Sequence, residues 1–230
     1  MTFSDRFKIR TMQELMDLID EVGFVPFFAN EIDGFSLEEH IGKGCWYTDG
    51  EDGFWPAWEW KGPVIRKKKC AYGKILRGKA MYVSSKFFPD LANYRRDGYD
   101  FDARYDDGLA SFYDKEMYEL TAENAPVLSK KLKSIGGYGK NGKKGFDTSM
   151  TRLQKQCYVI VSDFQYETDK YGNSYGWGIA EYSTPEAFMG KKFTDQVYKR
   201  TPEESYERLV KQFMKILPKA DIEQIGHILK

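Results

Sequence analysis

The chain has 230 residues, with 35 basic and 35 acidic side chains, so its formal net charge at pH 7 is zero. Hydrophobic residues make up 41% of it and aromatic residues 16%, which excludes an intrinsically disordered chain and predicts a folded core rich in aromatic rings. No apolar run approaches the roughly 18 residues of a membrane span. Residues 1–10 do not have the apolar centre of a signal peptide, so we expect a cytoplasmic protein with no membrane contact.

The few cysteines and histidines argue against disulfide and metal chemistry. Cys45, Cys70 and Cys157 are scattered and odd in number, and His40 and His227 are the two histidines. These spacings match neither a disulfide framework nor a zinc site. Phosphate-loop and hydrolase signatures are missing as well, so we expect no metal and no cofactor.

The first 108 residues are predicted to contain helices and a β-hairpin. A capping box at Thr11–Glu14 opens a helix that ends at Gly23. An extended segment, 24–28, follows it, and a second capping box at Ser36–Glu39 opens a short helix. Residues 64–83 have the pattern of a hairpin.

Four tryptophans lie between residues 46 and 62, where glycine and aspartate favour a loop or short strand over a helix. Trp55, Trp58 and Trp60 stand next to the basic run 66–69, an arrangement that suits base stacking. A buried aromatic core under the hairpin explains the same residues and is the preferred interpretation.

A helix is predicted for residues 85–94, and a polar segment follows it. Between 95 and 108 this segment has Asp100, Asp102 and Asp106, carboxylates that suit acid–base work or a divalent metal. Arginines of the same segment can pair with these carboxylates, so a salt-bridged loop is the alternative.

Residues 109–183 have the element order of a winged helix-turn-helix. A first helix is followed by a short helical segment at 128–135, a glycine-rich turn and a helix that begins at Asp147 or Thr148. A β-hairpin with a polar tip at 168–174 completes the motif.

We therefore predict an α+β fold in three parts. An N-terminal helix and β-hairpin region (1–108) precedes the winged helix-turn-helix (109–183), and a C-terminal helical segment (184–230) packs on the rest. The last part begins two helices at Thr184–Pro185 and Thr201–Pro202, because proline is favoured in the first turn of a helix.

The first half of the predicted winged helix is strongly basic. Between residues 128 and 156 there is one acid, Asp147, against Lys130, Lys131, Lys133, Lys140, Lys143, Lys144, Arg152 and Lys155. A local excess of about seven positive charges is what a phosphate-binding surface needs. The neighbouring stretch 97–123 has nine acids, so this surface exists only if the acidic segments fold away from it.

Duplex DNA is thus the predicted partner. On the third helix of the motif we expect Ser149, Thr151, Arg152, Gln154 and Lys155 to be exposed for contacts with bases and phosphates. The side chains predicted to bind nucleic acid are Lys130, Lys131, Lys143, Lys144, Arg152, Lys155 and, at the tip of the hairpin, Lys170.

Several stretches resemble the AlkZ-related proteins of bacteria, which are in turn distantly similar to the AlkZ/YcaQ-type winged-helix DNA glycosylases. The stretches are CAYGK at 70–74, FPDLANYRR at 88–96, GYDFDARYDDG at 98–108, TRLQKQ at 151–156 and YGWG at 175–178. Those glycosylases remove alkylated or crosslinked bases from DNA with a Gln-x-Gln or Gln-x-Asp pair that positions a water. The resemblance implies base excision and gives that role to Gln154 and Gln156. Two residues apart on one helix, these side chains point in different directions, and contact with DNA or solvent is the alternative.

Two other functions stay open at this point. The first is a non-catalytic winged helix that contacts protein, with the acidic and basic faces pairing between molecules. The aspartates of 95–108 would instead make the protein a metal-dependent enzyme.

Overall fold

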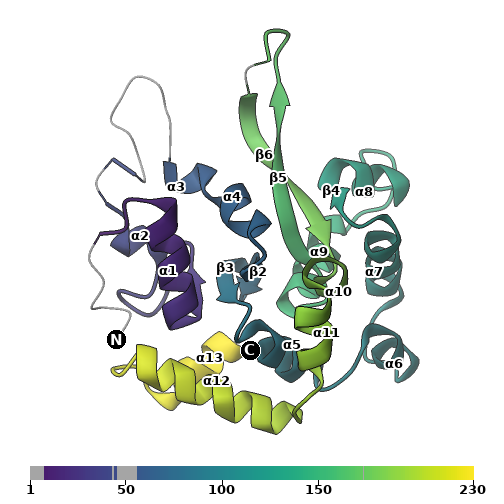
Figure 1. The fold of residues 1–230 in the computed structure, drawn as a ribbon. Helices are drawn as coiled ribbons and strands as arrows, with labels where there is room; N and C mark the ends of the chain where they lie inside the picture. Colours follow the sequence, from purple (N-terminus) through teal and green to yellow (C-terminus); the bar gives the residue numbers. More distant parts are fainter. Residues whose placement is uncertain (1–7, 43, 46–55, 173) are drawn as a thin grey trace.

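The structure, a computed structural model, describes residues 8–42, 44–45, 56–172 and 174–230 (Figure 1). Trp46 and Trp55 of the tryptophan-rich segment lie outside the described residues. The elements in chain order are α1 (Met12–Val22), β1 (Phe24–Pro26), α2 (Leu37–His40), α3 (Pro56–Glu59), α4 (Lys61–Arg66), β2 (Cys70–Leu76), β3 (Lys79–Ser84), α5 (Phe88–Arg96), α6 (Phe101–Asp106), α7 (Phe112–Asn124), β4 (Val127–Leu128), α8 (Ser129–Ile135), α9 (Phe146–Lys155), β5 (Ile160–Thr168), β6 (Ser174–Ser183), α10 (Pro185–Met189), α11 (Lys191–Val197), α12 (Pro202–Ile216) and α13 (Ile222–Leu229).

The helix α1 begins and ends as predicted. The Thr11 hydroxyl accepts a hydrogen bond from the Glu14 N–H, and the Glu14 carboxylate accepts one from the Thr11 N–H. At the other end Gly23 has a φ of 88°, and a Cβ there would lie 2.6 Å from the ring of Phe87. Glycine is needed here because it allows the left-handed turn and leaves room for that ring.

The first sheet has the strand order β1-β3-β2 and is antiparallel. The hairpin predicted for 64–83 is confirmed in β2 and β3, where Tyr72 lies opposite Tyr82. The second sheet has the order β4-β6-β5, also antiparallel. Its long β5–β6 hairpin extends away from the rest of the molecule at the top of Figure 1.

The segment from α7 to β6 runs as a helix, a short strand, two helices and a hairpin. Its third helix, α9, begins at Phe146, slightly earlier than the predicted start at Asp147 or Thr148. The N-cap is Gly145, with a φ of 92°, and its left-handed conformation turns the chain into the helix without a side-chain cap.

The helix α5 holds several parts of the chain together. Both α11 and α12 pack on it. Elsewhere, α4 packs beside β5, and Arg66 of α4 binds Asp163 of β5 at 2.6 Å. Buried apolar side chains from the N-terminal helices, both sheets and the C-terminal helices form one continuous cluster. None of the helices in the described ranges combines the length and apolar character that crossing a membrane requires.

Two predictions about the first half of the chain need correction. Residues 56–62 lie in the helices α3 and α4 where a loop or short strand was predicted, and α4 continues to Arg66, into the start of the hairpin predicted for 64–83. Their buried residues, Ala57, Lys61, Val64 and Ile65, recur at helical spacing, so packing against the core outweighs the local glycine. The helix predicted for 85–94 is α5, which begins only at Phe88, with Pro89 in its first turn.

Candidate nucleic-acid interface

The outer face of α9 is polar and basic. Asp147, Thr148 and Arg152 are exposed, and Thr151 and Lys155 are half-buried on the same side. Their spacing of three or four residues places them along one stripe of the helix. This stripe is the part of the predicted third helix that a ligand can reach.

The inner face of α9 takes two residues that were predicted to be exposed. Met150 and Leu153 are buried as expected, but Ser149 and Gln154 are also buried, at 4% and 1% exposure. Ser149 is four residues before Leu153 and therefore shares its stripe. The expectation that these two polar residues face solvent was wrong.

A hollow of about 630 Å³ opens beside the outer face. It brings together three predicted site residues, Arg152, Lys155 and Gln156, with the hydroxyls of Thr148 and Thr151. The other residues that line it are Tyr94, Arg95, Leu229 and Lys230. Cations combined with hydroxyl and amide donors are the groups that bind phosphate oxygens.

Arg95 holds the wall of this hollow in place. Its guanidinium donates to the carbonyl oxygens of Ile75, Lys155, Ile228 and Leu229 at 2.7–3.0 Å. It thereby ties β2, the end of α9 and α13 to α5. Burial lowers the pKa of Arg95. Because most of its N–H groups already donate to carbonyl oxygens, Arg95 contributes positive charge to the hollow but few free hydrogen-bond donors.

Arg152 is fixed by an acid of the neighbouring helix α7. Its Nε lies 2.7 Å from Asp114 Oδ2 and its Nη2 lies 2.9 Å from Asp114 Oδ1. The carboxylate is buried, whereas the arginine side chain is 45% exposed. A two-point contact of this kind orients the guanidinium but offsets its charge.

Other bases of the block between residues 128 and 156 are also paired. Lys130 binds Glu167, Lys143 binds Glu116, and Lys133 lies 3.7 Å from Asp147. The acids from outside the block are Asp114, Glu116 and Glu167, so they reduce the excess of about seven positive charges to about four. These partners come from α7 and β5, whereas the acidic segment 97–107 makes no ion pair with the block in the part of the chain that the structure describes.

Four lysines of the block keep their charge without such a partner. Lys131 of α8, Lys140 and Lys144 of the loop before α9, and Lys155 at the end of α9 make no ion pair with any described residue. Lys170, at the tip of the hairpin, is exposed and its ammonium lies 4.8 Å from the ring centre of Tyr171. The positive charge available to a ligand is concentrated on these side chains.

The two glutamines of the Gln-x-Gln triplet face different surroundings. Gln154 Oε1 accepts a hydrogen bond from the Lys74 N–H at 2.9 Å, and its Nε2 donates to the Met150 carbonyl at 3.3 Å. A Cβ on Gly73 would lie 2.8 Å from Gln154 Oε1, so β2 approaches α9 closely because residue 73 is glycine. Gln156, by contrast, lines the hollow.

Replacing Gln154 by leucine is expected to lower the free energy of unfolding by about 1–3 kcal/mol, because the Lys74 N–H loses its acceptor. Urea denaturation measures this change. Gln156→Leu, at the edge of the hollow, serves as the control and is expected to stay within about 0.5 kcal/mol of the original protein. Equal losses in the two variants would contradict the structural role of Gln154.

Two aspartates of 95–108 are used in local structure. Asp100 caps α6 by accepting from the Ala103 N–H at 2.8 Å, and Asp107 accepts from the Tyr99 hydroxyl at 2.9 Å. Among the described residues, no three His, Cys, Asp or Glu side chains gather in a way that would hold a metal ion.

Two of the three tryptophans beside the basic run 66–69 are described, and their packing agrees with the interpretation of an aromatic core under the hairpin. Trp58 and Trp60 pack against the buried cluster. Trp58 also covers Lys61, whose Nζ lies 3.1 Å from the ring centre. Lys61 itself is 4% exposed. Burial lowers the pKa of its ammonium, the negative charge of Glu59 offsets part of this effect, and the resulting pKa is about 7.

Sequence reasoning missed the residues that enclose the hollow from outside α9. Tyr94 and Leu229 have no local pattern that points to a ligand, because their position depends on how α5 and α13 meet α9. The Arg95-Arg96 pair was the one available signal, since adjacent arginines at the end of a largely buried helix need acceptors from elsewhere.

Comparison with known proteins adds a family. No curated protein and no solved structure gives a significant match to the chain. The model of the AlkZ related family matches residues 9–230. This range is nearly the whole chain and includes every residue that lines the hollow beside α9. The chain therefore belongs to the AlkZ-related family.

Proposed function

We propose that the protein binds duplex DNA, with the segment from α7 to β6 acting as a winged helix-turn-helix. The order of its elements supports this, since a helix, a strand, two helices and a hairpin follow one another and the first strand pairs with the last. In such a motif the third helix and the hairpin are the parts that approach DNA.

The observation that carries the proposal is the set of lysines left without a partner. Besides Lys140, four of them were predicted as site residues: Lys131, Lys144, Lys155 and Lys170 come from α8, the loop before α9, the end of α9 and the hairpin tip, and none makes an ion pair with a described residue. The phosphate contacts proposed for Lys130, Lys143 and Arg152 are weaker, because each has an acid beside it. Free lysines release counterions from DNA, and this is the main source of affinity that does not depend on sequence.

Neutralising these four lysines together is expected to weaken binding of a labelled duplex by roughly 100-fold at low salt, because four phosphate contacts are lost. The variant carries Lys131→Gln, Lys144→Gln, Lys155→Gln and Lys170→Gln, and fluorescence anisotropy gives its affinity. Each lysine is exposed or half-buried, so folding should be unaffected.

A matched control removes the same charge elsewhere. Lys191, Lys192, Lys215 and Lys219 are exposed on α11, α12 and the turn after α12, and changing all four to glutamine keeps the net charge of the two variants equal. The proposal fails if both variants lose the same affinity, because the effect would then be one of net charge alone.

Base excision of alkylated bases is the finer proposal that membership of the AlkZ-related family supports. Gln156 is better placed for it than Gln154, since it lines the hollow and Gln154 is committed to β2. Release of free base from an alkylated duplex is the assay for this activity.

A further inference from the structure

A second hollow is formed by α12 and the residues just before it. It has a volume of about 560 Å³ and is lined by Lys199, Arg200, Glu204, Glu207, Arg208 and Lys211. None of these residues lines the hollow beside α9, and none belongs to the proposed DNA contacts.

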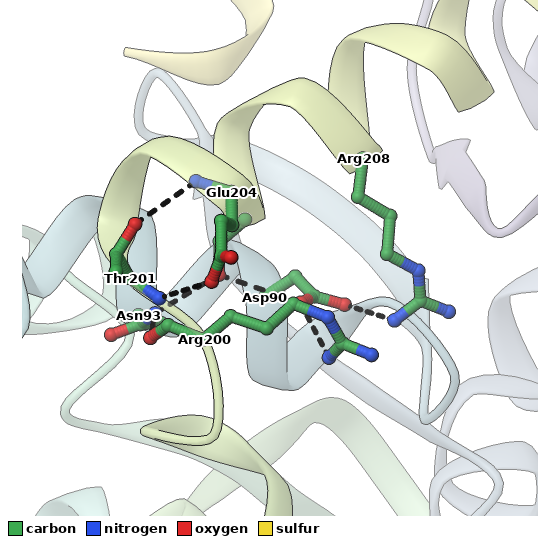
Figure 2. Close-up of polar contacts among 7 residues, drawn as sticks. Asp90, Asn93, Arg200, Thr201, Glu204 and Arg208 are labelled. Atoms are coloured by element: carbon green, nitrogen blue, oxygen red, sulfur yellow. Dashed lines mark hydrogen bonds and ion pairs between the residues drawn. The ribbon is translucent and has the colours of Figure 1, made fainter.

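Two arginines of this hollow share one buried carboxylate (Figure 2). Arg200 Nη1 lies 3.2 Å from Asp90 Oδ1, and Arg208 Nη1 lies 2.5 Å from Asp90 Oδ2. Asp90, on α5, is 2% exposed, whereas the arginine side chains are 33% and 38% exposed. One carboxylate for two guanidinium groups leaves a net positive charge at the wall of the hollow.

The arginines keep donors for a ligand. Each uses Nη1 on Asp90, and their Nε and Nη2 groups make no hydrogen bond with any described residue. Arg208 also lies 5.1 Å from the ring centre of Phe87. A guanidinium that is already held by a carboxylate and a ring face loses little conformational entropy when it binds a ligand.

The acids of the hollow oppose an anion only in part. The Glu204 carboxylate accepts a hydrogen bond from the Thr201 N–H at 2.9 Å, as the capping box of α12 requires (Figure 2). The Glu207 carboxylate makes no hydrogen bond or ion pair with any described residue. Lys199 and Lys211 add two ammonium groups on the rim.

We propose that this hollow binds a phosphate oxyanion through Arg200 and Arg208, with Lys199 and Lys211 as further cations. Two pre-oriented guanidinium groups match the several oxygens of a phosphate better than single ammonium groups do. The phosphate belongs either to a nucleic-acid backbone or to a free phosphorylated molecule.

Inorganic pyrophosphate is the probe for the site, with affinity measured by isothermal titration calorimetry. Arg208→Lys keeps a cation on Asp90 but loses the planar fork, and we expect it to weaken pyrophosphate binding at least tenfold. Lys215→Gln, on the same helix but outside the hollow, is expected to leave the affinity unchanged. Glu207→Gln is expected to increase it, because a negative charge is removed from the lining.

The two sources of phosphate are separated by repeating the titration with duplex DNA. Loss of pyrophosphate binding alone in Arg208→Lys indicates a free phosphorylated molecule, and loss of both indicates the backbone. The proposal is overturned if the original protein does not bind pyrophosphate, or if Arg208→Lys and Lys215→Gln bind it equally well while thermal melting shows both folded.

Discussion

Replacing Arg96 by methionine is expected to lower the free energy of unfolding by about 3–5 kcal/mol, the usual cost of breaking a buried ion pair. The Arg96 side chain is 1% exposed and donates to Glu186 Oε1 at 2.7 Å, to the Tyr198 hydroxyl at 3.0 Å and to the Cys157 carbonyl at 2.6 Å. The loss therefore removes a link between α5, the end of α9 and α10.

The same residue also packs between two rings. Its guanidinium carbon lies 4.4 Å from the ring centre of Tyr158 and 5.3 Å from that of Phe193. Burial alone would lower the pKa of Arg96, but Glu186 and Tyr198 more than offset it and the pKa is raised. The cation is thus stabilised by its surroundings.

Chemical denaturation of the Arg96→Met variant measures the change. Adding Glu186→Gln is expected to recover part of the stability, because the carboxylate left without its partner is then neutral. A loss below about 1 kcal/mol in the single variant, or no recovery in the double variant, would contradict a stabilising role for this pair.

Replacing Lys61 by methionine is expected to stabilise the protein most below about pH 7, by less as the pH rises from 7, and by little near pH 10. Burial lowers the pKa of Lys61 in the folded protein from the ordinary 10.5 to about 7. Between these values the unfolded chain binds more protons than the folded chain, so stability of the original protein rises with pH across this window.

The size of this effect follows from the shift. One pKa unit corresponds to about 1.4 kcal/mol, so the difference between the variants amounts to up to about 5 kcal/mol at low pH. Attraction between the ammonium and the face of Trp58 favours the charged form and keeps the difference below that bound.

Urea denaturation of both proteins at several pH values from 6 to 10 tests the expectation. Comparing the two proteins removes the contribution of other groups that titrate in this range. Parallel curves of stability against pH would contradict a lowered pKa for Lys61 in the folded protein.

The elements with complete local signals could be predicted from the sequence. Thr11 and Glu14 set the start of α1, and Thr201 and Pro202 set the start of α12, with their own side chains. Capping depends on residues three or four apart, so the information lies within one turn. The strands β2 and β3 were predictable because the pattern of a hairpin is also local in sequence.

The inner and outer faces of α9 could be predicted only in part. Apolar Met150 and Leu153 identify the buried stripe, but nothing in the local pattern shows that Gln154 faces inward as well. Its burial depends on the Lys74 N–H, 80 positions earlier. A polar residue whose partner is distant in sequence has no periodic signal.

The charge of the candidate site was predictable in sign and overestimated in size. The lysines and Arg152 stand in one stretch of sequence, but Asp114, Glu116 and Glu167, which offset three of them, come from α7 and β5. Charge along the chain becomes charge on a surface only after the fold has placed the acids.

The affinity of the protein for a labelled DNA duplex, measured at several salt concentrations, tests the central claim most directly. Binding through free lysines of α8, α9, their connecting loop and the hairpin tip predicts that the logarithm of the association constant falls linearly with the logarithm of salt, with a slope of about −4. No binding at low salt, or an affinity indifferent to salt, would contradict the proposal that this surface binds DNA.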